Sequence, residues 1–365
     1  MSGAPAPIPP ARPVIGESEI QAAVRVLRGG RVVQGPEVAA FEAEFAALVD
    51  GRHCVAVNSG TSALQLTLLA LGIGAGDEVI VPSFSFAATA NAVRLVGAEP
   101  VFADIDPRTY CLDPRAVSAL VGPRTAALMP VHLYGHPAAM DELTPLVERH
   151  GLAVVEDACQ AHGAALHARP VGAHGAAGCF SFYPTKNMHA LEGGMVSVAD
   201  AELARTLRLL RNQGMEARYA NEIVGANMRM TDVNAAVGRV QLGSLPDWTD
   251  RRRAHAKRLD ALITADAVTT PYVADGARHV YHQYTVRIAN GQRDHVQRQL
   301  EAAGIGSAVY YPTPIHRLAP YDTGDQLPET DRAAAEVLSL PVHPTLTDRE
   351  IERVADAVNS IAGSL

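Results

Sequence analysis

Short apolar runs alternate with helical patterns along the first half of the chain. Seven runs lie between positions 53 and 198: His53–Asn58, Glu78–Pro82, Pro100–Asp104, Ala126–His132, Leu152–Glu156, Cys179–Phe182 and Met195–Val198. Segments with helical spacing lie between most of them, at Ser62–Leu71, Ala87–Val96, Pro114–Leu120 and Ala139–His150. Such an alternation predicts a mostly parallel sheet covered on both faces. The stretch joining the last two runs is too short for a helical crossover, so we expect one of them to be antiparallel.

The pattern changes after residue 200. Helical patterns occur at Ala201–Asn212, Thr231–Leu245, Asp247–Ile263 (beginning just after Pro246), Arg293–Ala303 and Asp348–Asn359, and weaker strands at Tyr284–Ile288 and Ser307–Tyr310. Mixed helices and strands beyond residue 264 predict a second α/β unit. We therefore expect a large domain at 1–245, including an N-terminal segment, and a small C-terminal domain at 246–365.

The composition is that of an ordinary globular protein. The chain has 365 residues, is 48% hydrophobic and 19% charged, and carries a formal net charge of −8. This charge disfavours a general nucleic-acid binder, which normally shows a basic surface. Four cysteines lie far apart with no CxxC pair, which favours reduced thiols over zinc ligands or disulfides. The Pro- and Ala-rich start has no signal-peptide core, and no apolar run reaches bilayer length. We expect a cytoplasmic protein without a membrane partner.

Three segments with chemically useful side chains follow predicted strands, where open α/β sheets bind ligands. The first is Val57-Asn58-Ser59-Gly60-Thr61-Ser62-Ala63. Gly60 permits close approach of the backbone, and the following amides lie at a helix N-terminus, which suits a phosphate group. An ordinary Ser/Thr helix cap is the alternative interpretation.

The second segment ends a strand with two carboxylates, Glu156 and Asp157, followed by Cys159 and Gln160. Side chains alternate along a strand, so the two carboxylates are expected on opposite faces rather than as an acid/base pair. A buried carboxylate needs a positive partner, and a protonated heterocyclic nitrogen would serve. A helix-capping aspartate is the alternative.

The third segment is Phe180-Ser181-Phe182-Tyr183-Pro184-Thr185-Lys186-Asn187, with Glu192-Gly193-Gly194 behind it. It places a lysine in a constrained turn after a strand. A surface lysine is the alternative, but a lysine beside a bound cofactor can act as nucleophile and proton carrier. Together the three segments supply a phosphate site, a carboxylate for a pyridinium nitrogen and a Schiff-base lysine, as pyridoxal phosphate (PLP) requires.

Several ordered motifs also resemble a known family. The runs NSGTSALQLTLLALGIGAGDEVIVPSFSF, PVHLYGHPAAMDEL, EDACQAHG and CFSFYPTKN resemble PLP-dependent sugar aminotransferases of the DegT/StrS type over about residues 12 to 360. The resemblance implies the α/β fold of fold-type I PLP-transferases, with a large, mostly parallel seven-stranded sheet and a smaller C-terminal α/β domain. It also implies a homodimer with shared active sites, PLP and its amino form pyridoxamine phosphate as cofactor, and two substrates, an amino-acid donor and a nucleotide sugar.

The resemblance further implies roles for individual residues. Lys186 would be the Schiff-base lysine and proton shuttle, and Asp157 the partner of the pyridinium nitrogen. The remaining cofactor residues would be Gly60, Thr61 and Ser181 at the phosphate, Phe86 stacked on the ring, Gln160 at the 3-hydroxyl, and Asn227 reaching the neighbouring subunit's cofactor. More weakly, Arg229, Tyr311 and His316 resemble substrate-binding positions.

The reaction implied is transfer of an amino group, from glutamate in the family pattern, to a nucleotide-linked 4-keto-6-deoxyhexose. Carbon 4 is favoured because Glu192-Gly193-Gly194 resembles members that aminate there. Amination of a 3-keto-6-deoxyhexose or of a keto-inositol (scyllo-inosose type) stays open. A PLP-dependent sugar dehydratase would have histidine in place of Lys186, and a non-catalytic regulatory homologue would have lost Lys186 or Asp157.

Three other features of the sequence are not expected to form sites. The glycine-rich stretch 71–77 follows a helix and precedes a strand, the reverse of a dinucleotide loop, and is expected to be a turn. His132 and His136 straddle Gly135 at the end of a strand, so they share no helical face for a metal. We expect no catalytic metal. Arg251, Arg252 and Arg253 are expected on the solvated side of a helix, and a diphosphate contact is the alternative.

Overall fold

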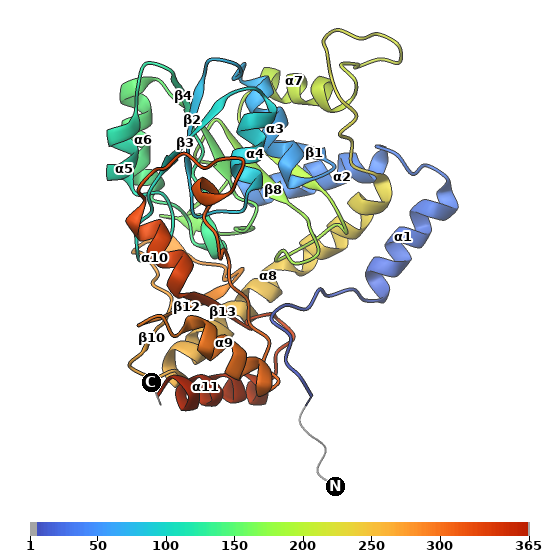
Figure 1. Ribbon diagram of the computed structural model, residues 1–365. Coiled ribbons are helices and arrows are strands. Elements are labelled where there is room, and N and C mark those ends of the chain that lie inside the picture. Colours follow the sequence, from blue (N-terminus) through green and yellow to red (C-terminus); the bar gives the residue numbers. More distant parts are fainter. Residues whose placement is uncertain (1–5, 364–365) are drawn as a thin grey trace.

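The computed structural model describes residues 6–363; the first five residues of the Pro-rich start and residues 364–365 lie outside it. A seven-stranded sheet forms the upper part of the molecule (Figure 1), in the order β1-β9-β8-β5-β4-β2-β3. The strands are β1 (His53–Val57), β2 (Glu78–Pro82), β3 (Glu99–Ala103), β4 (Thr125–Leu128), β5 (Ala153–Asp157), β8 (Ala177–Ser181) and β9 (Gly194–Val198). β9 runs antiparallel to both of its neighbours, β1 and β8, and is the one reversed strand of this sheet. The predicted sheet and its single antiparallel strand are thus confirmed.

Helices cover both faces of this sheet. They are α2 (Pro36–Phe45), α3 (Gly60–Ala70), α4 (Ala88–Leu95), α5 (Pro114–Leu120), α6 (Met140–His150) and α7 (Ala201–Arg211). One buried cluster joins α3, α4 and α7 to the strands, and a second packs under α5 and α6. Because the parallel strands are covered on both faces, their side chains are apolar at nearly every position.

A smaller three-stranded sheet, β10-β12-β13, forms the lower part (Figure 1). Its strands are β10 (Val268–Thr269), β12 (Tyr284–Ile288) and β13 (Val337–Leu340), packed against α9 (Arg293–Ala302) and α11 (Asp348–Ala362). A third sheet of two-residue strands comprises β6 (Ala165–Leu166), β7 (Arg169–Pro170) and β11 (Ala277–Arg278). Two further helices are α1 (Glu17–Gly29), which stands to the side, and α10 (Pro328–Glu336). Short 3-10 turns lie at Ala46–Val49, Leu133–Gly135 and Ile315–Arg317.

One helix, α8 (Asp232–Leu262), runs from the large sheet to the small one without interruption. The predicted division of this helix at Pro246 is wrong. Proline removes one backbone donor, but Pro246 is exposed, so water can satisfy the carbonyl it leaves unpaired. The boundary predicted after residue 245 lies inside this helix, and the division into domains stays a prediction.

Ser307–Tyr310 is not a strand, which is a second correction. A single bridge joins Ala308 to Ser339, and the rest of the segment is irregular. The glycine-rich stretch 71–77 is a turn between α3 and β2, as predicted. Among the described residues no helix combines the length and the apolar character needed to cross a bilayer.

Candidate active site

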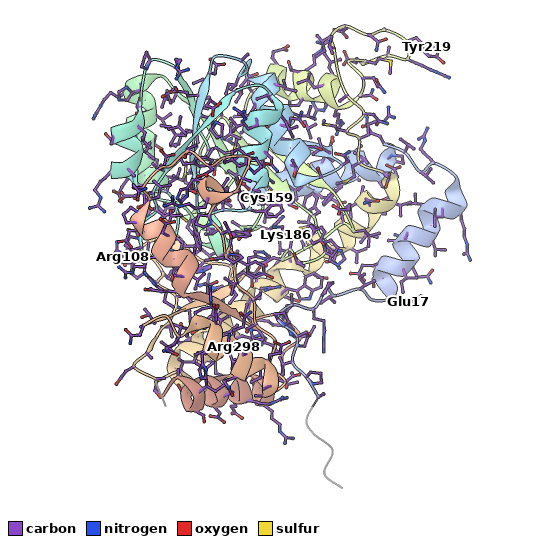
Figure 2. The ribbon with its side chains drawn as sticks, viewed as in Figure 1. Glu17, Arg108, Cys159, Lys186, Tyr219 and Arg298 are labelled. Carbon is purple, nitrogen blue, oxygen red and sulfur yellow. The ribbon has the colours of Figure 1, made fainter. Side chains whose placement is uncertain are left out.

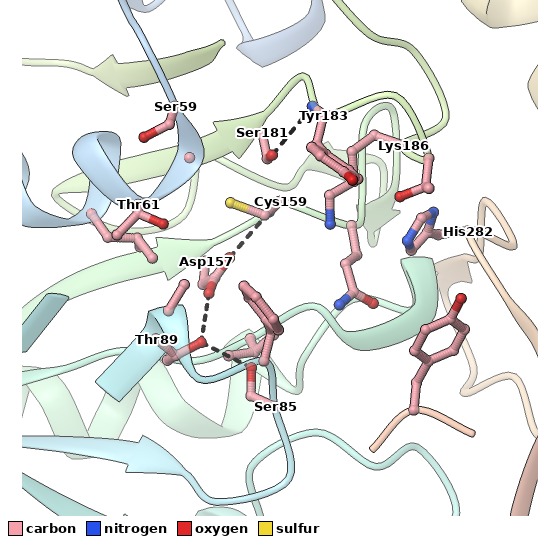
Figure 3. A pocket seen from close by; sticks show the side chains of 18 of the residues that line it. Ser59, Thr61, Ser85, Thr89, Asp157, Cys159, Ser181, Tyr183, Lys186 and His282 are labelled. Atoms are coloured by element: carbon pink, nitrogen blue, oxygen red, sulfur yellow. Dashed lines mark hydrogen bonds between the residues drawn. The ribbon is translucent and has the colours of Figure 1, made fainter. Parts of the chain in front are cut away.

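A cavity of about 430 Å³ opens at the carboxyl ends of β1, β5 and β8 (Figure 3). Eight of the eleven residues proposed from the sequence line it. They are Gly60, Thr61, Phe86, Asp157, Gln160, Ser181, Lys186 and Tyr311. The three strand-end segments, spread over 130 positions of the sequence, thus meet in one place. A cavity of this size suits a small organic ligand.

One end of the cavity is the N-terminus of α3. Ser59 caps this helix, since its Oγ accepts from the backbone N of Ser62 at 3.1 Å. A Cβ on Gly60 would lie 2.7 Å from the Cβ of Ser181 and 3.0 Å from the Sγ of Cys159, so no larger residue fits there. Ser59 therefore acts as an ordinary helix cap, and Ser181 also lies close to Gly60. The backbone amides that follow Ser59 form a site for an anion.

Asp157 lies at the floor of the cavity and is 5% exposed. Its Oδ2 accepts from the Oγ1 of Thr89 at 2.9 Å, and its Oδ1 accepts from the backbone N of Cys159 at 3.2 Å. Thr89 has one hydroxyl proton, so Ser85 must be the donor in the 2.8 Å contact between the two hydroxyls. Each carboxylate oxygen keeps a free lone pair, so Asp157 is oriented but still able to accept from a ligand.

Glu156 points to the opposite face of β5, as predicted. It is fully buried and accepts from the backbone N atoms of Gly172, His174 and Gly175 at 2.7–2.8 Å and contacts the Nε2 of His132 at 3.1 Å. Burial opposes its ionisation, but the contact with His132 and the backbone donors outweigh burial and lower the pKa of Glu156. Glu156 is thus a structural anion.

Replacing Glu156 with glutamine is expected to lower the free energy of unfolding by about 2–4 kcal/mol at pH 7, because buried backbone donors lose a charged acceptor. A carboxylate whose pKa is lowered on folding stabilises the native state above its ordinary pKa of 4.5 and ceases to do so as the pH falls through the lowered value. The wild-type protein should therefore lose stability in acid more steeply than Glu156→Gln. Denaturant unfolding at pH 7 and at pH 4 measures both effects; equal pH dependence in the two proteins would contradict this assignment.

Lys186 reaches the cavity from a turn in which its backbone N donates to the carbonyl of Tyr183 at 2.9 Å. Among residues 6–363 its ammonium group makes no hydrogen bond. Burial lowers the pKa of Lys186, and the nearby Cys159 and Asp157 oppose this shift only in part. The amine therefore loses its proton more readily than a free lysine does, which suits both nucleophilic attack and proton transfer.

His282, which no sequence motif indicated, lies beside Lys186 in the cavity wall (Figure 3). Its Nδ1 lies 3.3 Å from the Oδ1 of Asn187, the residue after the lysine, and the Nδ2 of Asn187 donates to the carbonyl of Val280. Burial and the charge of Lys186 lower the pKa of His282 far below its ordinary value, so its ring is neutral. The segment around residue 280 therefore packs against the turn that carries Lys186.

Arg252 corrects another expectation, because it is 7% exposed rather than solvated. Its Nη1 donates to the carbonyl of Tyr281 at 3.2 Å, and burial lowers the pKa of Arg252 to about 10. Arg251 and Arg253, on either side of it, are exposed as predicted. α8 thus holds the backbone that supports the lysine turn.

Phe86 and Tyr311 form an aromatic wall, with ring centroids 6.0 Å apart. Phe86 is 59% exposed, which leaves a ring face free over the cavity. Gln160 is fixed between two groups: its Oε1 accepts from the backbone N of Tyr134 at 2.9 Å, and its Nε2 donates to the hydroxyl of Tyr311 at 3.0 Å. The second Nε2 proton of Gln160 is free for a ligand oxygen.

Three proposed residues lie outside this cavity. Asn227 is exposed on a loop beside β1, and the Nη1 of Arg229, two positions on, donates to the Oδ1 of Asn212 at 2.9 Å. His316 is fully buried, with its Nδ1 2.6 Å from the hydroxyl of Ser83. Their roles as functional residues stay predictions.

Behind the lysine turn lies a small hollow of about 20 Å³. Its wall includes Lys186, Arg12 and Trp248 of α8. The hydrogen bonds from His189 and Gln241 to the carbonyl of Val14 hold the N-terminal segment against this side. The side of the lysine turn that faces away from the cavity thus packs against the N-terminal segment and α8.

The site fits PLP in its donor set. The glycine cradle at Gly60 with the amides of α3 suits the phosphate, Asp157 has lone pairs for a protonated ring nitrogen, and Gln160 has a free proton for the phenolic oxygen. Lys186 has an amine without a hydrogen-bond partner in the described part of the chain. Phe86 offers a ring face for stacking.

Comparison with known proteins agrees with this geometry. Residues 13–359 match the model of the DegT/DnrJ/EryC1/StrS aminotransferase family. The erythromycin biosynthesis sensory transduction protein EryC1 of Saccharopolyspora erythraea is 46% identical, covering 92% of each chain. The dTDP-3-amino-3,4,6-trideoxy-alpha-D-glucose transaminase of Streptomyces venezuelae is 45% identical, covering 94% of this chain and 92% of the relative. The UDP-N-acetyl-3-dehydro-alpha-D-glucosamine 3-aminotransferase of Acidithiobacillus ferrooxidans is 43% identical, covering 92% and 91%.

Solved structures share the fold. The crystal structure of DesV from S. venezuelae superimposes with a TM-score of 0.91 at 45% identity, covering 94% of each chain. A sugar aminotransferase structure from Streptococcus pneumoniae, Spr1654, is 26% identical with TM-scores of 0.94 in its pyridoxamine phosphate form and 0.93 in its PLP form, covering at least 98% of each chain. These matches confirm the fold-type I architecture and the cofactor expected from the sequence.

Proposed function

Because the chain belongs to the DegT/DnrJ/EryC1/StrS aminotransferase family and is a PLP-dependent transaminase, we propose that it transfers the amino group of an amino acid to a keto sugar linked to a nucleoside diphosphate. The observation that carries the proposal is the meeting of Lys186, Asp157 and the Gly60 anion site in one cavity. An aromatic wall and free polar groups leave room beside them for a polar substrate.

PLP, when bound, supplies an electrophilic carbon and an electron sink. The amine of Lys186, whose pKa is lowered by burial, removes and returns the proton at the substrate carbon. Asp157 would keep a proton on the ring nitrogen, and Thr89 orients that carboxylate by donating to its Oδ2. Gln160 and Phe86 would orient the ring, and the amides of α3 with Ser181 would hold the phosphate. The presence of these side chains in one cavity supports the proposed roles.

For the carbon that receives the amine, we propose carbon 3. The segment Glu192-Gly193-Gly194 favours carbon 4 by its resemblance, and Glu192 lines the cavity. Support for the alternative comes from the names of two relatives at 45% and 43% identity, which specify carbon 3. Glutamate is the proposed donor.

We also propose a homodimer in which Asn227 of one subunit reaches the cofactor of the other. Asn227 is exposed and absent from the cavity of its own chain. The loop that carries it also exposes Tyr219 (Figure 2) at 80% and Val224 at 93%, an unusual exposure for large apolar side chains. A partner covering this loop would bury them.

The test is to convert the enzyme to its pyridoxamine phosphate form and to add candidate acceptors one at a time. The panel holds a dTDP-3-keto-6-deoxyhexose, the 4-keto isomer, scyllo-inosose and the unlinked sugars. The expected result is a return of the PLP absorbance with the 3-keto nucleotide sugar, at least tenfold faster than with the 4-keto isomer. Faster return with the 4-keto sugar would overturn carbon 3, and faster return with scyllo-inosose would overturn the nucleotide-sugar acceptor.

A further inference from the structure

A second cavity, of about 360 Å³, lies between the loop after β3 and the small sheet. Its walls include Arg108 and Tyr110 from that loop, Tyr272, Arg287 at the end of β12, and Arg332 and Glu336 of α10. It is nearly as large as the cofactor cavity, and none of its lining residues has a role in the proposed reaction. Segments more than 150 positions apart in the sequence thus line one open hollow.

The three arginines of this cavity differ in how many hydrogen bonds they make. Arg287 is held in place: its Nε and Nη2 donate to the Oε2 of Glu336 at 2.9 and 2.6 Å, and its Nη1 donates to the carbonyl of Pro107 at 3.0 Å. That pairing engages Oε2 of Glu336, the one carboxylate among the lining residues.

Arg108 and Arg332 have donors to spare. Arg108 reaches Asp106 at 3.5 Å, and Arg332 reaches Glu329 and Glu336 at 3.6 Å, with no side-chain hydrogen bond for either within residues 6–363. Three arginines and one carboxylate line the cavity, while Asp106 and Glu329 contact Arg108 and Arg332 from outside the lining. The N–H donors of Arg108 and Arg332 that remain without a hydrogen bond among the described residues favour an anion there.

Tyr110 gives a second, independent sign of a ligand. It is 6% exposed, and its hydroxyl has no hydrogen-bond partner in the described part of the chain. Phe84 and Tyr134 pack against its ring at 6.1 and 5.7 Å, and its backbone adopts a left-handed φ of 61°. Strained conformations of this kind concentrate at functional sites. Burial raises the pKa of Tyr110, so its hydroxyl stays a proton donor beside the charges of Arg287 and Glu336.

We propose that this cavity binds a phosphate ester of a sugar or nucleoside, with the phosphate held by Arg108, Arg332 and the hydroxyl of Tyr110. The volume exceeds that of a bare phosphate, and the guanidinium of Arg108 lies over the ring of Tyr272, 4.6 Å from its centroid, which holds this cation at the cavity wall. Thr269, Thr270 and Asn290 add polar groups for hydroxyls. The site is separate from the cofactor cavity and its existence does not depend on the proposed substrate.

The test uses the intact holoenzyme and isothermal titration calorimetry. The probes are glucose 1-phosphate and uridine monophosphate, with glucose and uridine as matched compounds that lack phosphate. The variants are Arg108→Ala/Arg332→Ala and Tyr110→Phe; the control is Arg298→Ala, an exposed arginine on α9 distant from Arg108 (Figure 2). We expect at least one phosphate ester to bind to the wild-type protein and to Arg298→Ala alike, roughly tenfold or more weakly to the double variant, and several-fold more weakly to Tyr110→Phe.

The relative affinity for the two probes distinguishes a sugar phosphate from a nucleotide. Equal affinity of the double variant and Arg298→Ala for both esters would overturn the proposal, as would the absence of binding to the wild-type protein at millimolar concentration. Binding that does not need the phosphate would overturn it too. Because turnover is not measured, a failure here is distinct from a failure of the proposed function, for which the amino-acceptor panel is the test.

Discussion

Replacing Lys186 with alanine is expected to lower the rate of amino transfer by at least roughly 10⁴-fold, because nucleophile and proton carrier are lost together. The fold should persist, since the lysine ammonium has no hydrogen bond in the described residues. Single-turnover kinetics with glutamate measure the rate, and circular dichroism checks the fold. The visible absorbance of covalently bound PLP should also disappear.

The chain offers an unusually clean control, since Lys186 and Lys257 are its only lysines. Lys257 is exposed on α8, so Lys257→Ala should retain full activity. Borohydride treatment of the holoenzyme should fix the cofactor to the peptide containing Lys186 in the wild-type protein and in Lys257→Ala. A fixed cofactor at residue 257 or at the amino terminus, or an active Lys186→Ala, would contradict the assignment.

Removing the charge of Asp157 while keeping its shape is expected to have the second largest effect. Asp157→Asn should lower turnover by roughly 10²-fold or more, because a neutral amide no longer holds a proton on the ring nitrogen. PLP should still bind, since the Gly60 site and Lys186 are unchanged. The decrease should appear in kcat for both half-reactions, with a smaller change in the apparent affinity for PLP.

The adjacent carboxylate makes a matched comparison. Glu156→Gln removes the same charge one residue earlier, on the opposite face of β5, where the side chain binds backbone amides. It should lower stability and leave the turnover of the folded enzyme within about twofold, whereas Asp157→Asn should do the reverse. Near-normal turnover in Asp157→Asn would remove its proposed role.

The strands of the large sheet and most of the cofactor site could be predicted from the sequence. Each depends on local patterns: a short apolar run, and polar residues where the run ends. Parallel strands then bring their carboxyl ends together, so Asp157 and Lys186 meet without further information.

The packing of Arg252 and His282 near Lys186 could not be predicted from local sequence patterns. Arg252 resembles its exposed neighbours in sequence, and only the crossing of α8 by residues 279–283 buries it. His282 has no motif and acquires its environment from segments a hundred positions apart. The helix was predicted to break at Pro246. This proline lies on the solvated side of the helix, where water can replace the hydrogen bond that it removes, so the helix continues. The contact proposed for Asn227 is with a second chain, so the sequence of one chain alone could not test it.

The hollow behind the lysine turn has an optical consequence. Trp248, on its wall, is the only tryptophan of the chain, and Lys186, the proposed Schiff-base lysine, lines the same hollow. All indole emission therefore originates beside the active site, close enough for energy transfer to a bound chromophore. Quenching of this single fluorophore would report, without any label, each time the enzyme gains or loses PLP.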